Sequence, residues 1–199
     1  VEFIGLFISL FGLFIRAYAV GHTPANTSGR NTKEQLADEL NTTGIYSMVR
    51  HPLYLGNFFM WLGAAVLTKN GWFIVAFILL YWIYYERIMF AEEQFLRRKF
   101  GSVYTDWANK TPAFIPSFKK YIPSKYPFSW KKVLKKEKNG LLAVFVLLFV
   151  FHNINYSFLT NHIRIDLNWI AWGTFAAGIL YLVLKFLKKK TSILNETGR

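Results

Sequence analysis

The stretch GIYSMVRHPLYLGNFFMWLG, residues 44–63, starts with mixed polar residues and continues as an apolar run. An Arg-His-Pro triplet, Arg50 to Pro52, stands where this run begins. Pro52 has no amide hydrogen, and a proline disfavours helix in the residue before it, so a helix is expected to start at Pro52. The stretch therefore predicts a helix whose first turn lies beside two potentially cationic side chains.

The composition is typical of a membrane protein. Of 199 residues, 53% are hydrophobic and 19% are aromatic, and the mean hydropathy is +0.23, which is too apolar for an ordinary soluble domain of this size. The net charge of +13 would suit nucleic acid, but the Lys and Arg residues gather between apolar segments. That pattern is typical of cytoplasmic loops, so we expect no nucleic-acid partner.

Metal and thiol chemistry are not indicated. The sequence contains no cysteine, which excludes disulfides, thiol nucleophiles and cysteine-based metal sites. The four histidines show no i,i+4 pairing, so we expect no metal site; they are His22, His51, His152 and His162. The chain begins at Val1 inside an apolar run without the small-residue cleavage pattern of a signal peptide, and we expect this run to be a membrane helix.

Five apolar segments predict an all-α fold, a polytopic transmembrane helical bundle of about five membrane helices. They are residues 1–20, 53–67, 72–85, 141–159 and 167–187. Because a helix needs about 20 apolar residues to cross a bilayer, the second and third segments are expected to form a short hairpin that is shielded by its neighbours or crosses where the membrane is thin. The fourth segment carries His152, Asn153 and Asn155 in its second half, which weakens the assignment or marks a polar face turned toward protein.

The distribution of Lys and Arg predicts the orientation. These residues gather in 21–52, 86–139 and 188–199, whereas the two short connections contain only Lys69 and Arg164. By the positive-inside rule the three basic stretches face the cytosol, in a prokaryotic inner membrane or the endoplasmic reticulum. The Arg-His-Pro triplet is then at the cytosolic membrane surface, and the cofactor pocket is expected there.

The triplet has two interpretations that spacing leaves open. The free N–H groups of a helix N-terminus attract a carboxylate or phosphate, Arg50 and His51 add donors, Tyr54 offers a ring face to a cation, and Gly56 gives a ligand room near the backbone. In the other interpretation this is a membrane anchor, with Arg at the interface, Tyr in the aromatic belt and Gly for helix packing.

A second constellation is YERIMFAEEQFLRRKFGSVYTDW, residues 85–107, which extends the third apolar helix out of the membrane. Glu86, Glu92 and Glu93 lie among apolar neighbours. A carboxylate near the membrane boundary needs a partner, and a cationic ligand would be one. The alternative is a surface ion pair between Glu93 and Arg97 at i,i+4.

The first motif, followed by EEQFLRRKFGSVYTDWANKTPAFIP, resembles the isoprenylcysteine carboxyl methyltransferase and phospholipid N-methyltransferase family over roughly residues 40–116. These are integral-membrane enzymes that use S-adenosylmethionine and release S-adenosylhomocysteine. The resemblance implies that Arg87 and Glu93 are catalytic. It also implies a cofactor site made of Arg50, His51, Pro52, Tyr54, Leu55, Gly56, Glu92 and Glu93.

The resemblance implies a lipidic or small hydrophobic acceptor that enters from the bilayer, with a carboxylate, amine or thiol as the methylated group. A carboxylate needs no general base, whereas an amine or thiol must lose a proton, for which Glu92 or Glu93 is the nearby base. Two alternatives stay open. One is an NADPH-dependent membrane lipid or sterol reductase, whose relatives share the first motif although no G-x-G-x-x-G stretch is present; the other is a non-catalytic membrane scaffold.

The chain is expected to divide into a methyltransferase core, residues 1–130, and a C-terminal part, residues 131–199. The core holds the motifs at 44–63 and 85–116. The C-terminal part is expected to comprise a basic interfacial linker, whose lysines can meet anionic lipid headgroups, and two further transmembrane helices. The sequence leaves the oligomeric state open.

Overall fold

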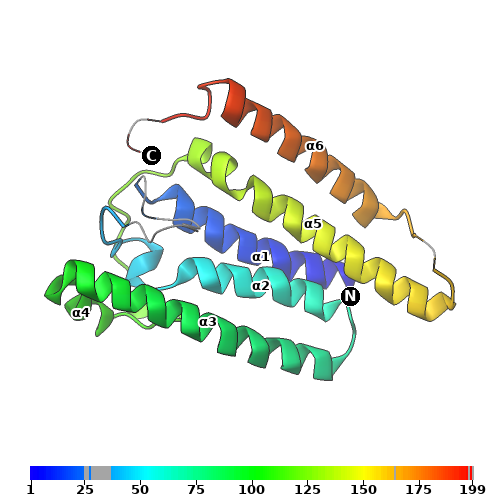
Figure 1. The fold of residues 1–199 in the computed structure, drawn as a ribbon, viewed down its shortest axis with the longest axis horizontal. Coiled ribbons are helices and arrows are strands. Elements are labelled where there is room, and N and C mark those ends of the chain that lie inside the picture. Colours follow the sequence, from blue (N-terminus) through cyan, green and yellow to red (C-terminus); the bar gives the residue numbers. More distant parts are fainter. Residues whose placement is uncertain (25–26, 28–36, 164, 197, 199) are drawn as a thin grey trace.

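The computed structural model describes residues 1–24, 27, 37–163, 165–196 and 198. Its helices are α1 (Glu2–Gly21), α2 (Pro52–Val66), α3 (Gly71–Phe100), α4 (Ser102–Ala108), α5 (Trp130–Thr160) and α6 (Trp169–Lys190), with short 3-10 turns at Ile45–Ser47 and Phe118–Lys120. Within the described residues the only β pairing is the isolated bridge between Gly44 and Ile122. The predicted all-α bundle is confirmed (Figure 1).

Four of the described helices, α1, α3, α5 and α6, are long and apolar enough to cross a membrane. The 15 residues of α2 give it a length of about 22 Å at 1.5 Å per residue, which is less than a hydrocarbon core of about 30 Å. The predicted hairpin is present, but only its first arm is short. The expectation that the third apolar segment is too short to cross was wrong, because α3 is long and apolar enough to span a membrane. Its continuation through residues 86–100 is as predicted.

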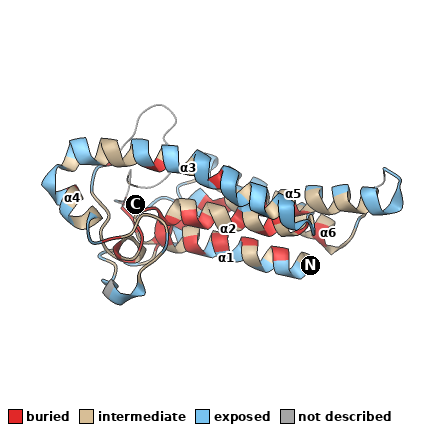
Figure 2. Cartoon of the chain, turned by 90° about the horizontal axis from the view of Figure 1, so that it is seen from below, coloured by how far each residue is buried: buried red, intermediate tan, exposed pale blue. Residues whose placement is uncertain are grey.

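Helix α2 is shielded by close packing on α1. A Cβ on Gly56 would lie 2.7 Å from the carbonyl oxygen of Gly12, and a Cβ on Gly5 would lie 2.7 Å from that of Gly63. The Ser9 hydroxyl donates to the Met60 carbonyl at 3.0 Å across the same contact. Small residues let two helix backbones approach in this way inside a membrane. Figure 2 shows the buried residues concentrated along α1 and α2, whereas α3 is largely exposed.

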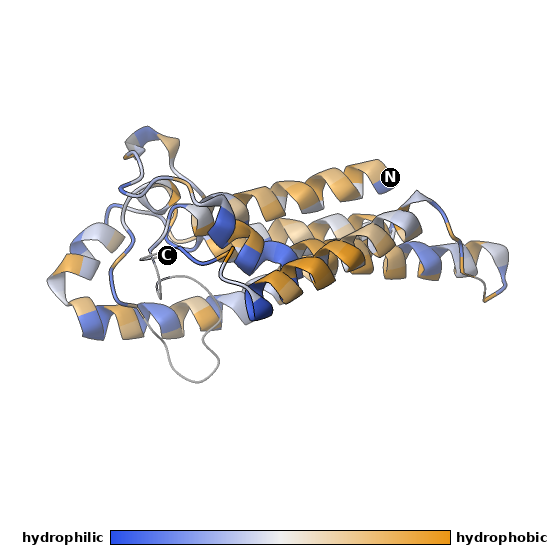
Figure 3. Ribbon diagram, turned by 90° about the horizontal axis from the view of Figure 1, so that it is seen from above, coloured by the Kyte–Doolittle hydropathy of each residue, from blue (hydrophilic) through white to orange (hydrophobic). Residues whose placement is uncertain are grey.

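The elements alternate between two ends of the bundle. Residues 37–51, α4, the segment 109–129 and residues 191–196 lie at one end (Figure 1). The N-terminus, the turn 67–70 and residues 161–163 and 165–168 lie at the other. This arrangement agrees with the alternation inferred from Lys and Arg, and the cytosolic assignment of the first end stays a prediction. Figure 3 shows apolar helix shafts between more hydrophilic ends.

The C-terminal helices pack directly on the rest of the bundle. Residues 130–140, expected to form a linker, are instead the first turns of α5, because Lys and Glu are good helix formers and Ser129 caps the helix by accepting from Lys132 N. Arg16 of α1 holds Glu137 of α5 through two hydrogen bonds of 2.8 Å. The division of the chain near residue 130 stays a prediction.

His152 and Asn153 of α5 face protein, which favours the inward polar face among the alternatives left for the fourth apolar segment. His152 contacts Glu2 Oε1 at 2.6 Å through Nδ1 and Asp166 Oδ2 at 2.8 Å through Nε2. The side chain of Asn153 accepts from Asp166 N at 2.7 Å. The helix is therefore a genuine membrane candidate with a polar stripe turned inward.

Candidate functional site

The loop that precedes α2 is held by a segment far along the chain. Arg50 N donates to Pro112 O at 2.9 Å, and His51 N donates to Ala113 O at 3.2 Å. Ser117 N donates to Met48 O at 2.9 Å, and Gly44 N donates to Ile122 O at 2.8 Å. Gly44 has φ +61°, a conformation that glycine adopts without strain. These bonds fix the backbone of residues 44–51, and with it the positions of Arg50 and His51.

The two sequence motifs meet directly. His51 Nε2 lies 2.9 Å from Glu93 Oε1, and His51 Nδ1 lies 3.6 Å from Glu92 Oε2. Arg50 Nη2 lies 3.4 Å from the same oxygen of Glu93. Two carboxylates of α3 therefore face two cationic groups at the start of α2, although the two sets are about 40 residues apart in sequence.

The charge of His51 is set by competing effects. Burial lowers the pKa of His51, and the carboxylates of Glu92 and Glu93, which contact its two ring nitrogens, raise it by more in sum. The net pKa is above the ordinary value for histidine. The imidazolium form is thus favoured, with a negative partner at each side.

Tyrosines line the site between α2 and α3. The rings of His51 and Tyr54 stack with centroids 5.6 Å apart, and Tyr54 meets Tyr85 at 5.3 Å. Tyr85 stacks on Tyr81 at 4.0 Å, and the Tyr81 hydroxyl donates to Tyr54 O at 2.6 Å. Burial and the Glu92 carboxylate raise the pKa of Tyr46, on the preceding loop, so its hydroxyl stays protonated. We call Tyr46, Tyr54, Tyr81 and Tyr85 the tyrosine wall.

The other predicted residues of α2 point elsewhere. Leu55 is buried in a cluster with Ile15 and Val49, and Gly56 lies against Gly12 and Arg16 of α1. Packing against α1 thus explains why a small residue stands at Gly56. Pro52 is fully buried at the start of the helix. The cofactor roles of Pro52, Leu55 and Gly56 stay predictions.

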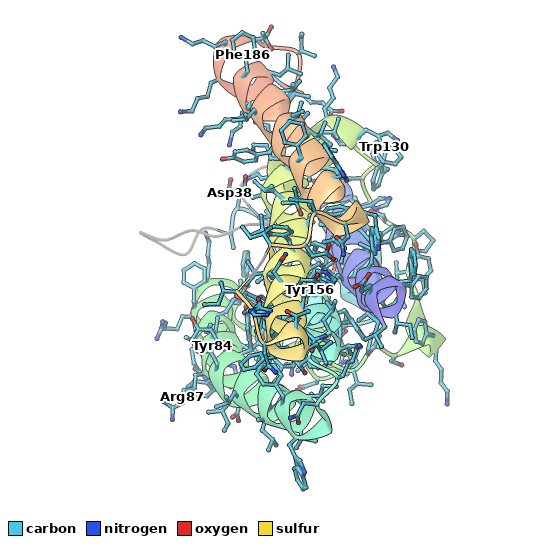
Figure 4. All side chains as sticks on the ribbon, turned by 90° about the vertical axis from the view of Figure 1, so that its right-hand side faces the viewer. Asp38, Tyr84, Arg87, Trp130, Tyr156 and Phe186 are labelled. Carbon is cyan, nitrogen blue, oxygen red and sulfur yellow. The ribbon has the colours of Figure 1, made fainter. Side chains whose placement is uncertain are left out.

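The side chain of Arg87 does not lie with the other predicted site residues. Its side chain is exposed, and Figure 4 shows it at the periphery of α3, next to Tyr84 and pointing outward. The helix turns by about 100° per residue, so Arg87 lies about 120° around the axis from Glu93. A catalytic role for Arg87 stays a prediction that the position of this side chain does not favour.

The structure adds residues that sequence reasoning missed. Tyr104 is 1% exposed, and burial followed by the nearby Glu93 carboxylate raises its pKa to about 12. Three buried side-chain atoms have no hydrogen-bond partner within the described residues: Arg50 Nε, Tyr104 Oη and Trp107 Nε1. The spacing of Tyr81, Tyr85 and Glu92, which places them on one face of a helix, was the available signal for the tyrosine wall.

An apolar groove adjoins the tyrosine wall. It has a volume of about 190 Å³ and shares Tyr81 with the wall. Its lining comes from α2, α3 and the loop after α4: Phe58, Ile78, Leu79, Tyr81, Trp82 and Phe114. The groove therefore places hydrocarbon-compatible surface next to charged and aromatic groups.

Residues 2–103, just over half of the chain, match the family described as phospholipid methyltransferase. The chain belongs to this family. Membership confirms the resemblance drawn from the two motifs. The matched region contains the whole first motif and residues 85–103 of the second, including Glu92 and Glu93.

Curated relatives of this family member extend the comparison. The protein-S-isoprenylcysteine O-methyltransferase of Saccharomyces cerevisiae is 31% identical over 115 residues, 57% of this chain and 48% of the relative. A probable enzyme of the same name from Oryza sativa subsp. indica is 33% identical over 123 residues, 58% of this chain and 61% of the relative. The nickel-cobalt-cadmium resistance protein NccN of Alcaligenes xylosoxydans xylosoxydans is 38% identical over 78 residues, 39% of this chain and 36% of the relative.

The match thus spans about half the length of these curated relatives. No solved structure matches the chain.

Proposed function

We propose that this chain is an integral-membrane methyltransferase that moves the methyl group of S-adenosylmethionine to a lipidic or hydrophobic acceptor. The observation that carries the proposal is the direct meeting of Arg50 and His51 with Glu92 and Glu93 beside the tyrosine wall. Family membership and the names of the relatives support methyl transfer as the chemistry.

The donor set fits a zwitterionic cofactor. Arg50, whose Nε has no partner within the described residues, suits a carboxylate, and so does the buried Tyr104 hydroxyl. The side chain of Glu92 is 38% exposed and holds His51 only at 3.6 Å, so it suits an ammonium or a ribose diol. The faces of Tyr54 and Tyr85 suit a sulfonium. When bound, S-adenosylmethionine supplies an electrophilic methyl group on that sulfonium.

The protein's own residues would then contribute positioning and a water-poor setting. Charge is lost when a sulfonium methylates an anion, so the apolar surroundings of the tyrosine wall favour the transition state over separated ions. Holding the reacting groups at near-attack distance can contribute about 7–11 kcal/mol. In this proposal, Glu92 or Glu93 would accept a proton from an amine or thiol acceptor.

The acceptor would reach the site along the apolar groove. Phe58, Trp82 and Phe114 give this groove aromatic sides suited to a hydrocarbon chain, and the relatives named S-isoprenylcysteine O-methyltransferases make a prenyl-bearing carboxylate the first acceptor to test. We further propose that this end of the bundle faces the cytosol, as the positive-inside rule indicates.

The test is transfer of a radiolabelled methyl group from S-adenosylmethionine into total lipid extract and into a prenylated cysteine analogue, followed by identification of the product. Wild type and Glu86→Gln, an exposed carboxylate on the same helix, should both label an acceptor. Glu93→Gln should label it much more slowly. Absence of label from wild type together with absence of cofactor binding would overturn the proposal, as would full activity of Glu93→Gln.

A further inference from the structure

The facing ends of α5 and α6 carry a concentration of lysines that methyl transfer does not use. Their sequences run antiparallel, so the first turns of α5 lie beside the last turns of α6 (Figure 1). We define the lysine cluster as Lys135, Lys136, Lys138, Lys185 and Lys188. The neighbouring carboxylates are engaged elsewhere, since Glu137 is held by Arg16 and Glu196 accepts from the Ser129 hydroxyl. Within the described residues, no member of the cluster has a carboxylate partner.

Lys138 is the most constrained member. It is 8% exposed, and its Nζ donates to the carbonyl oxygen of Lys135 at 2.8 Å. An ammonium has three donors, and a buried charge is costly unless an opposite charge accompanies it. The charged groups that act on Lys138 are Lys136, Lys185 and Lys188, all of the same sign. The fold thus holds a buried cation among like charges.

The depth of the cluster in the bundle indicates its ligand. Lys138 comes just before the apolar run that begins at Leu141, and Lys185 follows the apolar part of α6. Figure 3 shows these helix ends as hydrophilic turns on apolar shafts. In a membrane this is the level of the phospholipid headgroups, where basic sites between helices bind anionic lipids. The positive-inside rule concerns only how many Lys and Arg residues lie on the cytosolic side, and exposed lysines satisfy it. It therefore does not explain why Lys138 is buried.

We propose that the lysine cluster is a binding site for the phosphate of an anionic phospholipid from the adjoining leaflet. The lipid phosphate would supply the negative charge that the fold itself does not place there, and its acyl chains would lie along the exposed apolar faces of α5 and α6. This site is separate from the proposed methyltransferase site, so either proposal can fail without the other.

The experiment measures thermal unfolding of the full chain in nonionic detergent micelles that contain phosphatidylglycerol or phosphatidylcholine. The test variant is Lys138→Gln, Lys185→Gln and Lys188→Gln combined. The control variant has the same net charge and removes three exposed lysines at the same end of the bundle, Lys99→Gln, Lys110→Gln and Lys119→Gln.

Phosphatidylglycerol should raise the melting temperature of wild type and of the control variant by several degrees, and that of the test variant by much less. In phosphatidylcholine the test variant should be at least as stable as wild type, because it has lost like-charge repulsion. Native mass spectrometry should show retention of phosphatidylglycerol falling by roughly tenfold or more in the test variant. If the test variant fails to fold, Lys185→Gln with Lys188→Gln, both exposed, should show a smaller loss in the same direction.

Three results would overturn the proposal. One is an equal response of test variant and wild type to phosphatidylglycerol. Another is an equal loss of response in test and control variants, which would indicate general charge attraction. The third is an equal stabilisation of wild type by inorganic phosphate at matched concentration, which would indicate an ion site instead of a lipid site.

Discussion

The two ends of the bundle each hold a histidine between two carboxylates. His51 has Glu93 and Glu92 at its two ring nitrogens, and His152 has Asp166 and Glu2. At the His152 end the partners are further satisfied, because Trp169 Nε1 donates to Glu2 at 3.1 Å and Asn168 contacts the His152 ring at 2.9 Å.

The His51 end differs because some of its buried hydrogen-bond donors are not satisfied. Arg50 Nε and the Tyr104 hydroxyl are buried and form no hydrogen bond of good geometry within the described residues, although the Arg50 side chain lies near that hydroxyl. The rings of the tyrosine wall lie beside His51 and pack on one another. Each unsatisfied buried donor has a cost, and its retention calls for a ligand or an equivalent explanation. A histidine–carboxylate contact therefore does not by itself identify a site. What indicates a ligand site here is the presence, beside that contact, of buried donors without a well-formed hydrogen bond and of aromatic rings that can face a cation.

The largest expected difference is in cofactor affinity. His51→Ala and Glu93→Gln should each weaken S-adenosylmethionine binding by well over tenfold, that is by more than about 1.4 kcal/mol, because both remove a charged group from the proposed cofactor site. His152→Ala should bind as wild type does. Isothermal titration calorimetry in detergent measures both. Wild-type affinity in the His51 and Glu93 variants would contradict the site assignment.

Substitution of His152 should change the free energy of unfolding, although it leaves cofactor affinity unchanged. His152→Ala removes charge-assisted contacts that join the start of α1 to the loop before α6, and we expect it to lower the free energy of unfolding by about 1–2 kcal/mol. His162→Ala, an exposed histidine at the same end, is the matched control and should change little. Thermal unfolding without cofactor separates them, and a neutral His152→Ala would remove the structural role assigned to this cluster.

Tyr104→Phe sharpens the argument from unsatisfied donors. Removing a buried hydroxyl without a partner should raise the free energy of unfolding by about 1 kcal/mol. The same change should weaken S-adenosylmethionine binding by a few fold, because one donor to the carboxylate is lost. Tyr84→Phe, at an exposed position on α3, should alter neither. A destabilising effect of Tyr104→Phe would show that the Tyr104 hydroxyl has a hydrogen-bond partner in the native protein. Tyr104 would then no longer count as an unsatisfied donor at the His51 end.

The smallest expected effect is on pH dependence. The pKa of His51 is raised by Glu92 and Glu93 in the folded state, so its contribution to stability is fully present below the ordinary histidine pKa of about 6.5 and is lost as pH rises through the raised value. The difference in melting temperature between wild type and His51→Gln should therefore shrink from about pH 6 toward about pH 9. A difference that grows over this range would show that His51 is held neutral.

The candidate site was partly predictable. Arg50, His51, Tyr54, Glu92 and Glu93 were identified from two local motifs, and the structure brings them together. Tyr104 was missed because its burial depends on the fold of α4 after Gly101, which has φ +56°. Arg87 and Gly56 were assigned by position in a motif, and their directions depend on helix rotation.

By itself the sequence determined that the chain is a helical membrane protein, where α2 begins and which connections share one end of the bundle. Apolar run length, a proline without an amide hydrogen and clustered lysines act locally, so they can be read without a structure. The tertiary structure alone decided that Gly56 packs on α1, that α5 begins at Trp130, and that one histidine joins the candidate site while another ties the opposite end together. These outcomes depend on the rotation and register of helices distant in sequence, which close packing fixes and local pattern does not.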